Sequence, residues 1–234
     1  MSEDQLLQPI VGLHHVTAIA SDPQRNLDFY TKILGLRLVK RTINFDDPGT
    51  YHLYFGDDLG SPGTILTFFP WPHAVRGKVG VGETAATAFS VPAGSLPFWE
   101  TRLLTAGVAV DYQEDRFGDS VLRCSDPDGM RLELVAHAET FEGSSEIRTP
   151  RTSNVPAEQA IRGFFGVTLC EAGLELTSDV LQKMGFRRAA EAGMDEKPIV
   201  NFRERVNRVH IGGQKDRRLR FSNGNDAFGH QWTQ

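Results

Sequence analysis

The chain has 234 residues, 40% of them hydrophobic and 24% charged, with a formal net charge of −5 at pH 7. This composition is ordinary for a globular protein of one large or two small domains, and it excludes a chain that is disordered throughout. The negative charge gives no general attraction to nucleic acid, and no stretch is apolar over the length of a membrane helix.

Targeting and redox signals are sparse. The acidic start, Met1 to Asp4, lacks the basic and apolar regions of a signal peptide, so we expect a cytoplasmic protein. Cys124 and Cys170 are far apart and have no CxxC spacing, which argues against a disulfide framework, a zinc knuckle or a redox pair. Both are expected to be buried thiols.

Residues 13–19 alternate in the manner of a strand, with His15 and Thr17 on one face and His14 on the other. In a regular strand the two histidines would therefore point in opposite directions. Asp22 and Pro23 are a helix-start signal, and apolar residues at helical spacing continue to a stop at Gly35. Strand-like runs follow, which gives the order strand, helix and three strands: residues 38–43, 51–55 and 64–69.

The same order recurs twice. A second unit begins with a strand at 85–91 and a helix at 96–104, followed by strand-like runs at 108–110, 120–124 and 130–135. A third begins at Gly163 with a copy of the opening strand, in which Gly166 replaces His15. Two units of this kind are expected to pair into one curved sheet around a cavity.

The fold class is α+β, built from βαβββ modules, two complete and one partial. We expect units one and two to pair within residues 10–140, a polar linker over 141–156 and a partial third module over 157–192. The apolar periodicity fades after Gly193, so 193–234 is interpreted as a tail of uncertain structure. Its arginines are interpreted as solvated, and exposed edges in the third unit predict self-association or instability.

Six segments carry a resemblance to a known family: LHHVTAI, DFYTKILGLRLVKRT, YHLYFGD, GTILTFFPW, DPDGMRLELV and VPAEQAIRGFFGVTL. With them the chain resembles the vicinal oxygen chelate superfamily, which contains glyoxalases, bleomycin-resistance proteins and extradiol ring-cleaving dioxygenases. It is most similar to the hydroquinone-type ring-cleaving dioxygenases, where a histidine pair and a YHLYF strand occur together. The likeness covers about residues 10–190, although DPDG followed by LEL is common to the whole superfamily.

The resemblance implies an iron(II) site of two histidines and one glutamate, with open positions for a diol and oxygen. In this subgroup the first ligand falls on His15. His14 and Thr17 lie where the family places groups that contact the substrate oxygens, and His14 would steer protons or hydrogen bonds there.

The family takes its other two ligands from a fourth unit with motifs resembling HHxAF and GGVxFE, which this sequence lacks. Three explanations stay open: a truncated or frame-shifted product, a short form that completes its site by dimerisation, or a site within units one and two. The last would join His15 to Glu133, which lies at the superfamily's carboxylate position. Its weakness is the missing second histidine, because residues 86–88 are Ala, Thr and Ala.

Structural roles compete for the same residues. His15 can be a hydrogen-bonded core histidine, and Glu133 can face solvent on its strand. His52 is expected to make a structural hydrogen bond, with Tyr54 in the core or a cavity wall.

The sequence thus predicts an oxidoreductase, an Fe(II)-dependent extradiol-type ring-cleaving dioxygenase that acts with oxygen on a hydroquinone or catechol. Two alternatives stay open: a metal-free module that binds a small aromatic ligand without catalysis, and a glyoxalase-like isomerase that uses another divalent metal. No nucleic-acid or membrane partner is expected, whereas a homodimer is left open. Neither GxGxxG at a strand-to-helix turn nor GxxxxGK[ST] occurs, so nucleotide binding lacks support.

Overall fold

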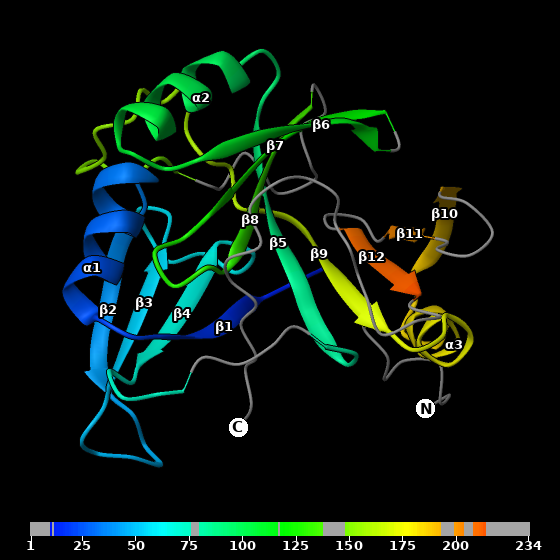
Figure 1. Ribbon diagram of the computed structural model, residues 1–234, viewed down its shortest axis with the longest axis horizontal. Helices are drawn as coiled ribbons and strands as arrows, with labels where there is room; N and C mark the ends of the chain where they lie inside the picture. Colours follow the sequence, from blue (N-terminus) through cyan, green and yellow to red (C-terminus); the bar gives the residue numbers. More distant parts are fainter. Residues whose placement is uncertain are drawn as a thin grey trace, which may run out of the picture.

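Three βαβββ units follow one another along the chain (Figure 1). The structure, a computed structural model, describes residues 10, 12–75, 80–116, 118–137, 148–192, 199–203 and 208–213. Each unit has a first strand, a helix and three further strands, so the predicted α+β class and its βαβββ repeat are confirmed.

Unit one forms a sheet of its own with the strand order β1-β4-β3-β2, in which β1 and β4 are parallel. Its helix α1 continues directly into a π-helical turn, η2. The elements of the unit are β1 (His15–Ala20), α1 (Pro23–Asp28), η2 (Phe29–Ile33), β2 (Arg37–Ile43), β3 (Tyr51–Gly56) and β4 (Ile65–Pro70).

The predicted helix start is confirmed in detail. The side chain of Asp22 accepts a hydrogen bond of 2.7 Å from the backbone N–H of Arg25, and Pro23 occupies the first turn. A capping oxygen satisfies one of the N–H groups that a helix start leaves without a partner, and proline lacks one of those groups altogether. The helix therefore begins where its local sequence dictates.

One face of the unit-one sheet packs against α1 and η2. Phe29, Tyr30 and Leu34 are buried there against side chains that alternate along the strands, namely Ala18, Ala20, Leu53, Phe55, Leu66 and Phe68. Because side chains of a strand alternate between its two faces, the residues between these positions, His15 and Thr17 among them, lie on the face opposite the helix.

Units two and three share one sheet of eight strands, in the order β10-β11-β12-β9-β5-β8-β7-β6. The two units meet where β5 and β9, their first strands, pair in antiparallel fashion. Unit two consists of β5 (Glu83–Pro92), α2 (Leu96–Thr105), β6 (Val110–Arg116), β7 (Asp119–Ser125) and β8 (Arg131–His137). Unit three consists of β9 (Phe164–Glu171), α3 (Glu175–Lys183), β10 (Arg187–Ala192), β11 (Ile199–Arg203) and β12 (Arg208–Gly213).

The expectation that units one and two share a sheet is wrong. Unit two pairs with unit three, and unit one contacts unit two through the turn before β8. Asp128 in that turn accepts hydrogen bonds from Ser21 (2.5 Å) and Arg25 (2.7 Å), and Asp126 accepts one from the hydroxyl of Tyr30 (3.0 Å). The three units have similar strand patterns, so these patterns do not determine which two of them share a sheet. That depends on which sheet edges come together in the folded chain.

The third unit is not partial. Strands β11 and β12 lie within the stretch that the sequence predicts to be a tail, and β12 runs parallel to β9 with Val209 opposite Val167. Both strands mix polar with apolar residues, Asn201 and Arg203 in β11 and Arg208 and His210 in β12, which hides the period of two, whereas pairing with β9 buries Val209. The parts of the predicted tail over 193–198, 204–207 and 214–234 lie outside the described residues, as does 138–147 at the start of the predicted linker.

The two cysteines are buried thiols, as expected. Burial raises the pKa of the Cys124 thiol to about 12, so it is protonated and unreactive at neutral pH. Separately, the helices in the described part of the chain are all too short or too polar to cross a membrane.

Candidate functional site

His14 and His15 lie side by side at the start of β1. Both are exposed, their rings meet edge to face with centroids 5.3 Å apart, and their Nδ1 atoms are 3.2 Å apart. The expectation that they point in opposite directions is wrong, because His14 precedes the strand and is free of its alternation. Its carbonyl accepts a hydrogen bond of 2.9 Å from the N–H of Gly63, which holds this irregular entrance to β1.

The contact between the two imidazoles engages Nδ1 on both rings. A hydrogen bond there requires one Nδ1 to carry a hydrogen and the other to accept it. A ligand or metal bound by His15 would therefore be held through Nε2, with the tautomer of His15 coupled to that of His14.

His15 and Thr17 belong to a row of polar and aromatic side chains across the unit-one sheet. We call the face that carries them, opposite α1, the open face; its residues are His15, Thr17, Lys40, His52, Tyr54, Thr67 and Phe69. The strand register sets Lys40 beside Tyr54, Tyr54 beside Thr67, and Thr67 beside Thr17. One line of side chains thus crosses all four strands.

The hydroxyl of Thr17 is oriented by its neighbour. Thr67 is buried, and its Oγ1 donates a hydrogen bond of 2.9 Å to Oγ1 of Thr17. Because a hydroxyl has one hydrogen and two lone pairs, Thr17 keeps its own hydrogen for a further acceptor. Thr17 is exposed, so a ligand over β1 can reach it.

Aromatic rings line the open face from β3 to the end of β4. The ring of His52 lies 4.1 Å from that of Tyr54 and 4.0 Å from that of Phe69, and Phe69 stacks on Trp71 at 5.9 Å. The ammonium group of Lys40 is 5.4 Å from the centre of the Tyr54 ring, within the range of a cation–π contact. The row offers flat apolar surface to an aromatic ligand.

The expected structural hydrogen bond of His52 is present, with the Tyr54 hydroxyl 2.9 Å from Nδ1. Burial lowers the pKa of His52, and the nearby positive charges of Lys40 and His15 lower it further. The imidazole is therefore neutral at neutral pH.

Glu133 lies on the other sheet. It is buried on β8, and its carboxylate accepts a hydrogen bond of 2.8 Å from Nε of Arg123 on β7. The alternative that it faces solvent is wrong, because Val121, Val135 and Phe165 form a buried cluster within the same sheet. Its role as a metal ligand stays a prediction, for which the ion pair with Arg123 would have to open.

The donor set for a metal ion is incomplete in the described residues. They contain no group of three or more His, Cys, Asp or Glu side chains that could hold an ion. His15 can supply one imidazole, but a facial triad needs a second histidine and a carboxylate at the same point. The described residues therefore do not fit a complete iron site.

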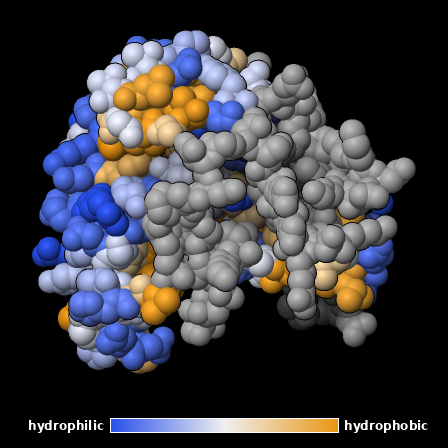
Figure 2. All heavy atoms as spheres, in the orientation of Figure 1, coloured by the Kyte–Doolittle hydropathy of each residue, from blue (hydrophilic) through white to orange (hydrophobic). Residues whose placement is uncertain are grey.

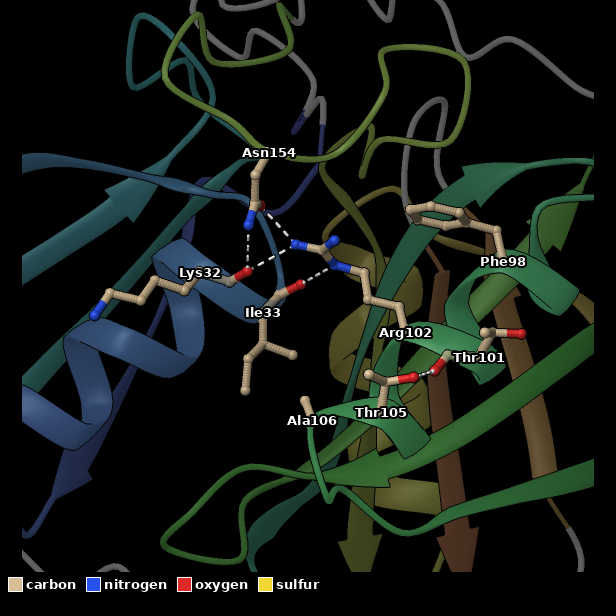
Figure 3. A pocket seen from close by; sticks show the side chains of 8 residues that line it. All are labelled: Lys32, Ile33, Phe98, Thr101, Arg102, Thr105, Ala106 and Asn154. Carbon is tan, nitrogen blue, oxygen red and sulfur yellow. Dashed lines mark hydrogen bonds between the residues drawn. The ribbon is translucent and has the colours of Figure 1, made fainter.

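A surface pocket lies elsewhere, between η2 and α2 (Figure 3). It has a volume of about 520 Å³, and no residue of the open face lines it. The guanidinium of Arg102 donates hydrogen bonds to the carbonyls of Ile33 and Lys32, both at 2.7 Å, and to Asn154 at 2.5 Å. Arg102 thus ties unit one to unit two, and the apolar surface over α2 (Figure 2) borders a structural joint.

The sequence analysis assigned no role to Lys40, Thr67 or Phe69 on the open face. The period of two in β4 was a usable signal, because the buried Leu66 and Phe68 place Thr67 and Phe69 on the opposite face. The alternation of β2 gave no such signal for Lys40, because the register shifts between Leu38 and Lys40. Trp71 was interpreted as a loop marker; its indole N–H donates a hydrogen bond of 2.8 Å to Thr50, which orients its ring beside Phe69.

Comparisons with known proteins identify the family to which this fold belongs. Residues 12–134 match the family profile described as the Glyoxalase/Bleomycin resistance protein/Dioxygenase superfamily. MhqO of Bacillus subtilis (strain 168), provisionally described as a ring-cleaving dioxygenase, is 46% identical over 184 residues, which are 78% of this chain and 57% of that protein. A chlorohydroquinone/hydroquinone 1,2-dioxygenase of Sphingobium indicum is 36% identical over 167 residues, 70% of this chain and 51% of that protein.

Solved structures with a similar fold include a protein described as a dioxygenase and a glyoxalase. A crystal structure of a protein from Bacillus subtilis subsp. subtilis str. 168, provisionally described as a dioxygenase, superposes with a TM-score of 0.77 at 40% identity, covering 88% of this chain and 64% of that one. Glyoxalase I from Zea mays superposes with a TM-score of 0.62 at 15% identity, covering 87% of this chain and 67% of that one, which is a likeness of fold. The chain spans little more than half the length of the curated relatives, 57% of MhqO and 51% of the hydroquinone dioxygenase.

Proposed function

Because the chain belongs to the glyoxalase/bleomycin resistance protein/dioxygenase superfamily, we propose that it is a ring-cleaving dioxygenase acting on a hydroquinone or a related aromatic diol. The observation that carries the proposal is the exposed pair His14 and His15 beside Thr17, at one edge of an aromatic face. The relatives named as ring-cleaving and hydroquinone dioxygenases support it.

We assign His15 as a ligand of iron(II), the metal that facial sites of two histidines and one carboxylate hold in oxygenases. His15 is exposed on the open face and can bind through Nε2, since its Nδ1 contacts His14. The described residues do not complete the set, so the proposal requires further ligands from outside them or from a second chain.

His14 and Thr17 are assigned to the substrate oxygens. His14 is exposed and shares its Nδ1 contact with His15, so its Nε2 can donate or accept at a phenolic oxygen. Thr17 accepts from Thr67 and can donate its own hydrogen. The two groups can thus orient a diol and hold its protons, as general acid–base chemistry requires.

Glu133 is left out of this assignment. Its carboxylate is buried in an ion pair with Arg123, and taking one partner from a buried pair leaves an uncompensated charge. We assign the pair a structural role in the eight-stranded sheet.

A second function is supported by the incomplete donor set. A module that binds a small aromatic molecule without metal needs only the ring surface of Tyr54, His52 and Phe69 and a few hydrogen-bonding groups. Binding of hydroquinone that a chelator leaves unchanged would favour this second function.

The test is iron(II) stoichiometry after anaerobic reconstitution, with oxygen uptake on hydroquinone measured on the same samples. We expect His15→Ala to weaken iron binding at least tenfold and to abolish oxygen uptake, on the scale that changes around metal sites produce. Glu133→Ala should retain iron binding and oxygen uptake when both are expressed per folded protein. His73→Ala, at an exposed histidine in the turn after β4, is the matched control.

Two results would contradict the proposal. Iron-loaded protein that consumes no oxygen with hydroquinone or catechol would exclude the dioxygenase. Loss of iron binding in folded Glu133→Ala, with no loss in His15→Ala, would move the metal to the other sheet. The oligomeric state recorded at the same concentration shows whether a second chain accompanies binding.

A further inference from the structure

One polar atom on the open face is buried without a hydrogen-bond partner among the described residues: Nε2 of His52. Leaving a buried donor or acceptor unsatisfied destabilises the folded state, so such atoms are rare in folded proteins and call for an explanation. The other unsatisfied side chains in the described part of the chain lie off this face: Asn26, Thr87, Ser95 and Gln159.

The imidazole of His52 is held in one orientation. Nδ1 contacts the Tyr54 hydroxyl at 2.9 Å, and the ring lies between those of Tyr54 and Phe69. Since Nδ1 is engaged, Nε2 is the ring nitrogen that remains for a ligand. A residue needed only for its contact with the Tyr54 hydroxyl would not require a second ring nitrogen buried between Tyr54 and Phe69.

The surroundings suit an aromatic ring with a hydroxyl group. Phe69 and Trp71 continue the apolar surface beside His52, and Thr17 lies on the same face with a hydroxyl oriented by Thr67. His52 is neutral, so its Nε2 can exchange one hydrogen bond with a phenol without a buried charge.

We propose that Nε2 of His52 hydrogen-bonds a ring hydroxyl of the aromatic diol and positions it, as a third contact beside His14 and Thr17. The Tyr54 hydroxyl engages Nδ1 on the other side of the ring, which leaves Nε2 for the diol. This inference rests on the proposed function, whose site it extends from β1 to β3. Because Nε2 is covered in this state, binding requires the side chains that cover it to shift.

The decisive measurement uses the full chain labelled with ¹⁵N-histidine and titrated with hydroquinone under anaerobic conditions. A hydrogen bond to the ligand shifts the Nε2 resonance of His52, assigned by its loss in His52→Phe, while Nδ1 stays bound to Tyr54. His73, exposed in the turn after β4, is the internal control and should not shift.

Kinetic variants give a second readout. His52→Phe keeps an aromatic ring in the row and removes both nitrogens; we expect KM for hydroquinone to rise about tenfold, the effect of one hydrogen bond of about 1.4 kcal/mol, with a smaller change in kcat. His52→Gln replaces Nε2 by an amide nitrogen at the same reach and should recover part of the affinity. A purely structural role would lower the folded fraction of His52→Phe and leave KM unchanged.

The outcomes separate this inference from the proposed function. If iron-loaded native protein consumes oxygen with hydroquinone while His52→Phe shows an unchanged KM and the Nε2 resonance does not move, the inference is wrong and the function stands. If the native protein consumes no oxygen but hydroquinone shifts Nε2, the function is wrong and the contact stands. Should neither uptake nor shift occur, both are wrong.

Discussion

Two aspartates in the turn before β8 hold unit one against unit two. Asp128 accepts hydrogen bonds from Ser21 and from Arg25, which is also its ion-pair partner at 2.7 Å. Asp126 is deeply buried and accepts from the hydroxyl of Tyr30 and the N–H of Met130. The side chains of this turn thus join two units.

Burial raises the pKa of Asp126 to about 6, more than its hydrogen bonds from Met130 and Tyr30 lower it. A carboxyl with a raised pKa in the folded state contributes stability below its unfolded value near 3.8, and that stability is lost as pH rises through about 6. We expect Asp126→Asn to remove this dependence, on the order of 3 kcal/mol between pH 4 and 6 at 1.36 kcal/mol per pKa unit.

Urea unfolding at a series of pH values measures this change. The free energy of unfolding of the native chain should fall between pH 4 and 6 relative to Asp126→Asn, whose amide oxygen can still accept from Met130. Asp46→Asn, at an exposed aspartate, is the control and should follow the native chain. Parallel curves for the native chain and Asp126→Asn would show that Asp126 is ionised throughout.

At the end of η2 the backbone packs closely against the segment over residues 153–155. Gly35 has a φ of +74°, and a Cβ there would lie 2.6 Å from both Oγ of Ser153 and Cγ2 of Val155. The predicted glycine stop thus does two things: it allows the left-handed backbone, and it lets residues 153–155 pack against the helix end. Arg102 reinforces the same joint from α2.

Gly35→Ala is expected to lower the free energy of unfolding by about 2–4 kcal/mol, because it combines backbone strain of about 1 kcal/mol with a steric clash of 1–3 kcal/mol. Gly107→Ala is the matched control: its φ is +76°, but a Cβ there has nothing within 4 Å, so only the strain of about 1 kcal/mol applies. Chemical denaturation of both variants checks the difference. Equal losses would mean that Ser153 and Val155 move aside at no cost.

For the whole molecule, the pairing of β5 with β9 makes units two and three one body. Their sheet is continuous through β9, β5 and β8, and its interior strands carry fully buried side chains such as Phe89, Leu132 and Leu134. Unit one has its own four-stranded sheet, and β2 is at its edge.

This arrangement predicts the order of amide hydrogen exchange. Peptides from β5, β8 and β9 should be protected longest and should exchange together, because opening one central strand exposes the next. Peptides from β2 should exchange first. Mass spectrometry over a time course in mild denaturant measures the order, and β9 exchanging well before β5 would show that the third unit opens separately.

The sequence by itself predicted the repeat of strand, helix and strands, the helix start at Asp22 and the glycine stops. Each depends on neighbouring residues: a period of two or 3.6, a cap, a proline or a glycine. The family letters added the expectation of a dioxygenase, and the likeness to the superfamily is confirmed. The resemblance also gave His15 as a candidate ligand; the roles of His14, His15, Thr17 and Glu133 stay predictions.

Only the tertiary structure determines the features that depend on residues far apart in the sequence. Three features follow from edges and faces that meet only after folding. They are the pairing of β5 with β9, the place of β11 and β12 in the third unit, and the ion pair of Glu133 with Arg123. His14 turned beside His15 because its backbone is held by Gly63, far along the chain. The pattern of a strand predicts which residues share a face of the sheet. Which other element packs against that face is determined by the energy of side-chain packing and of backbone hydrogen bonds in the whole fold.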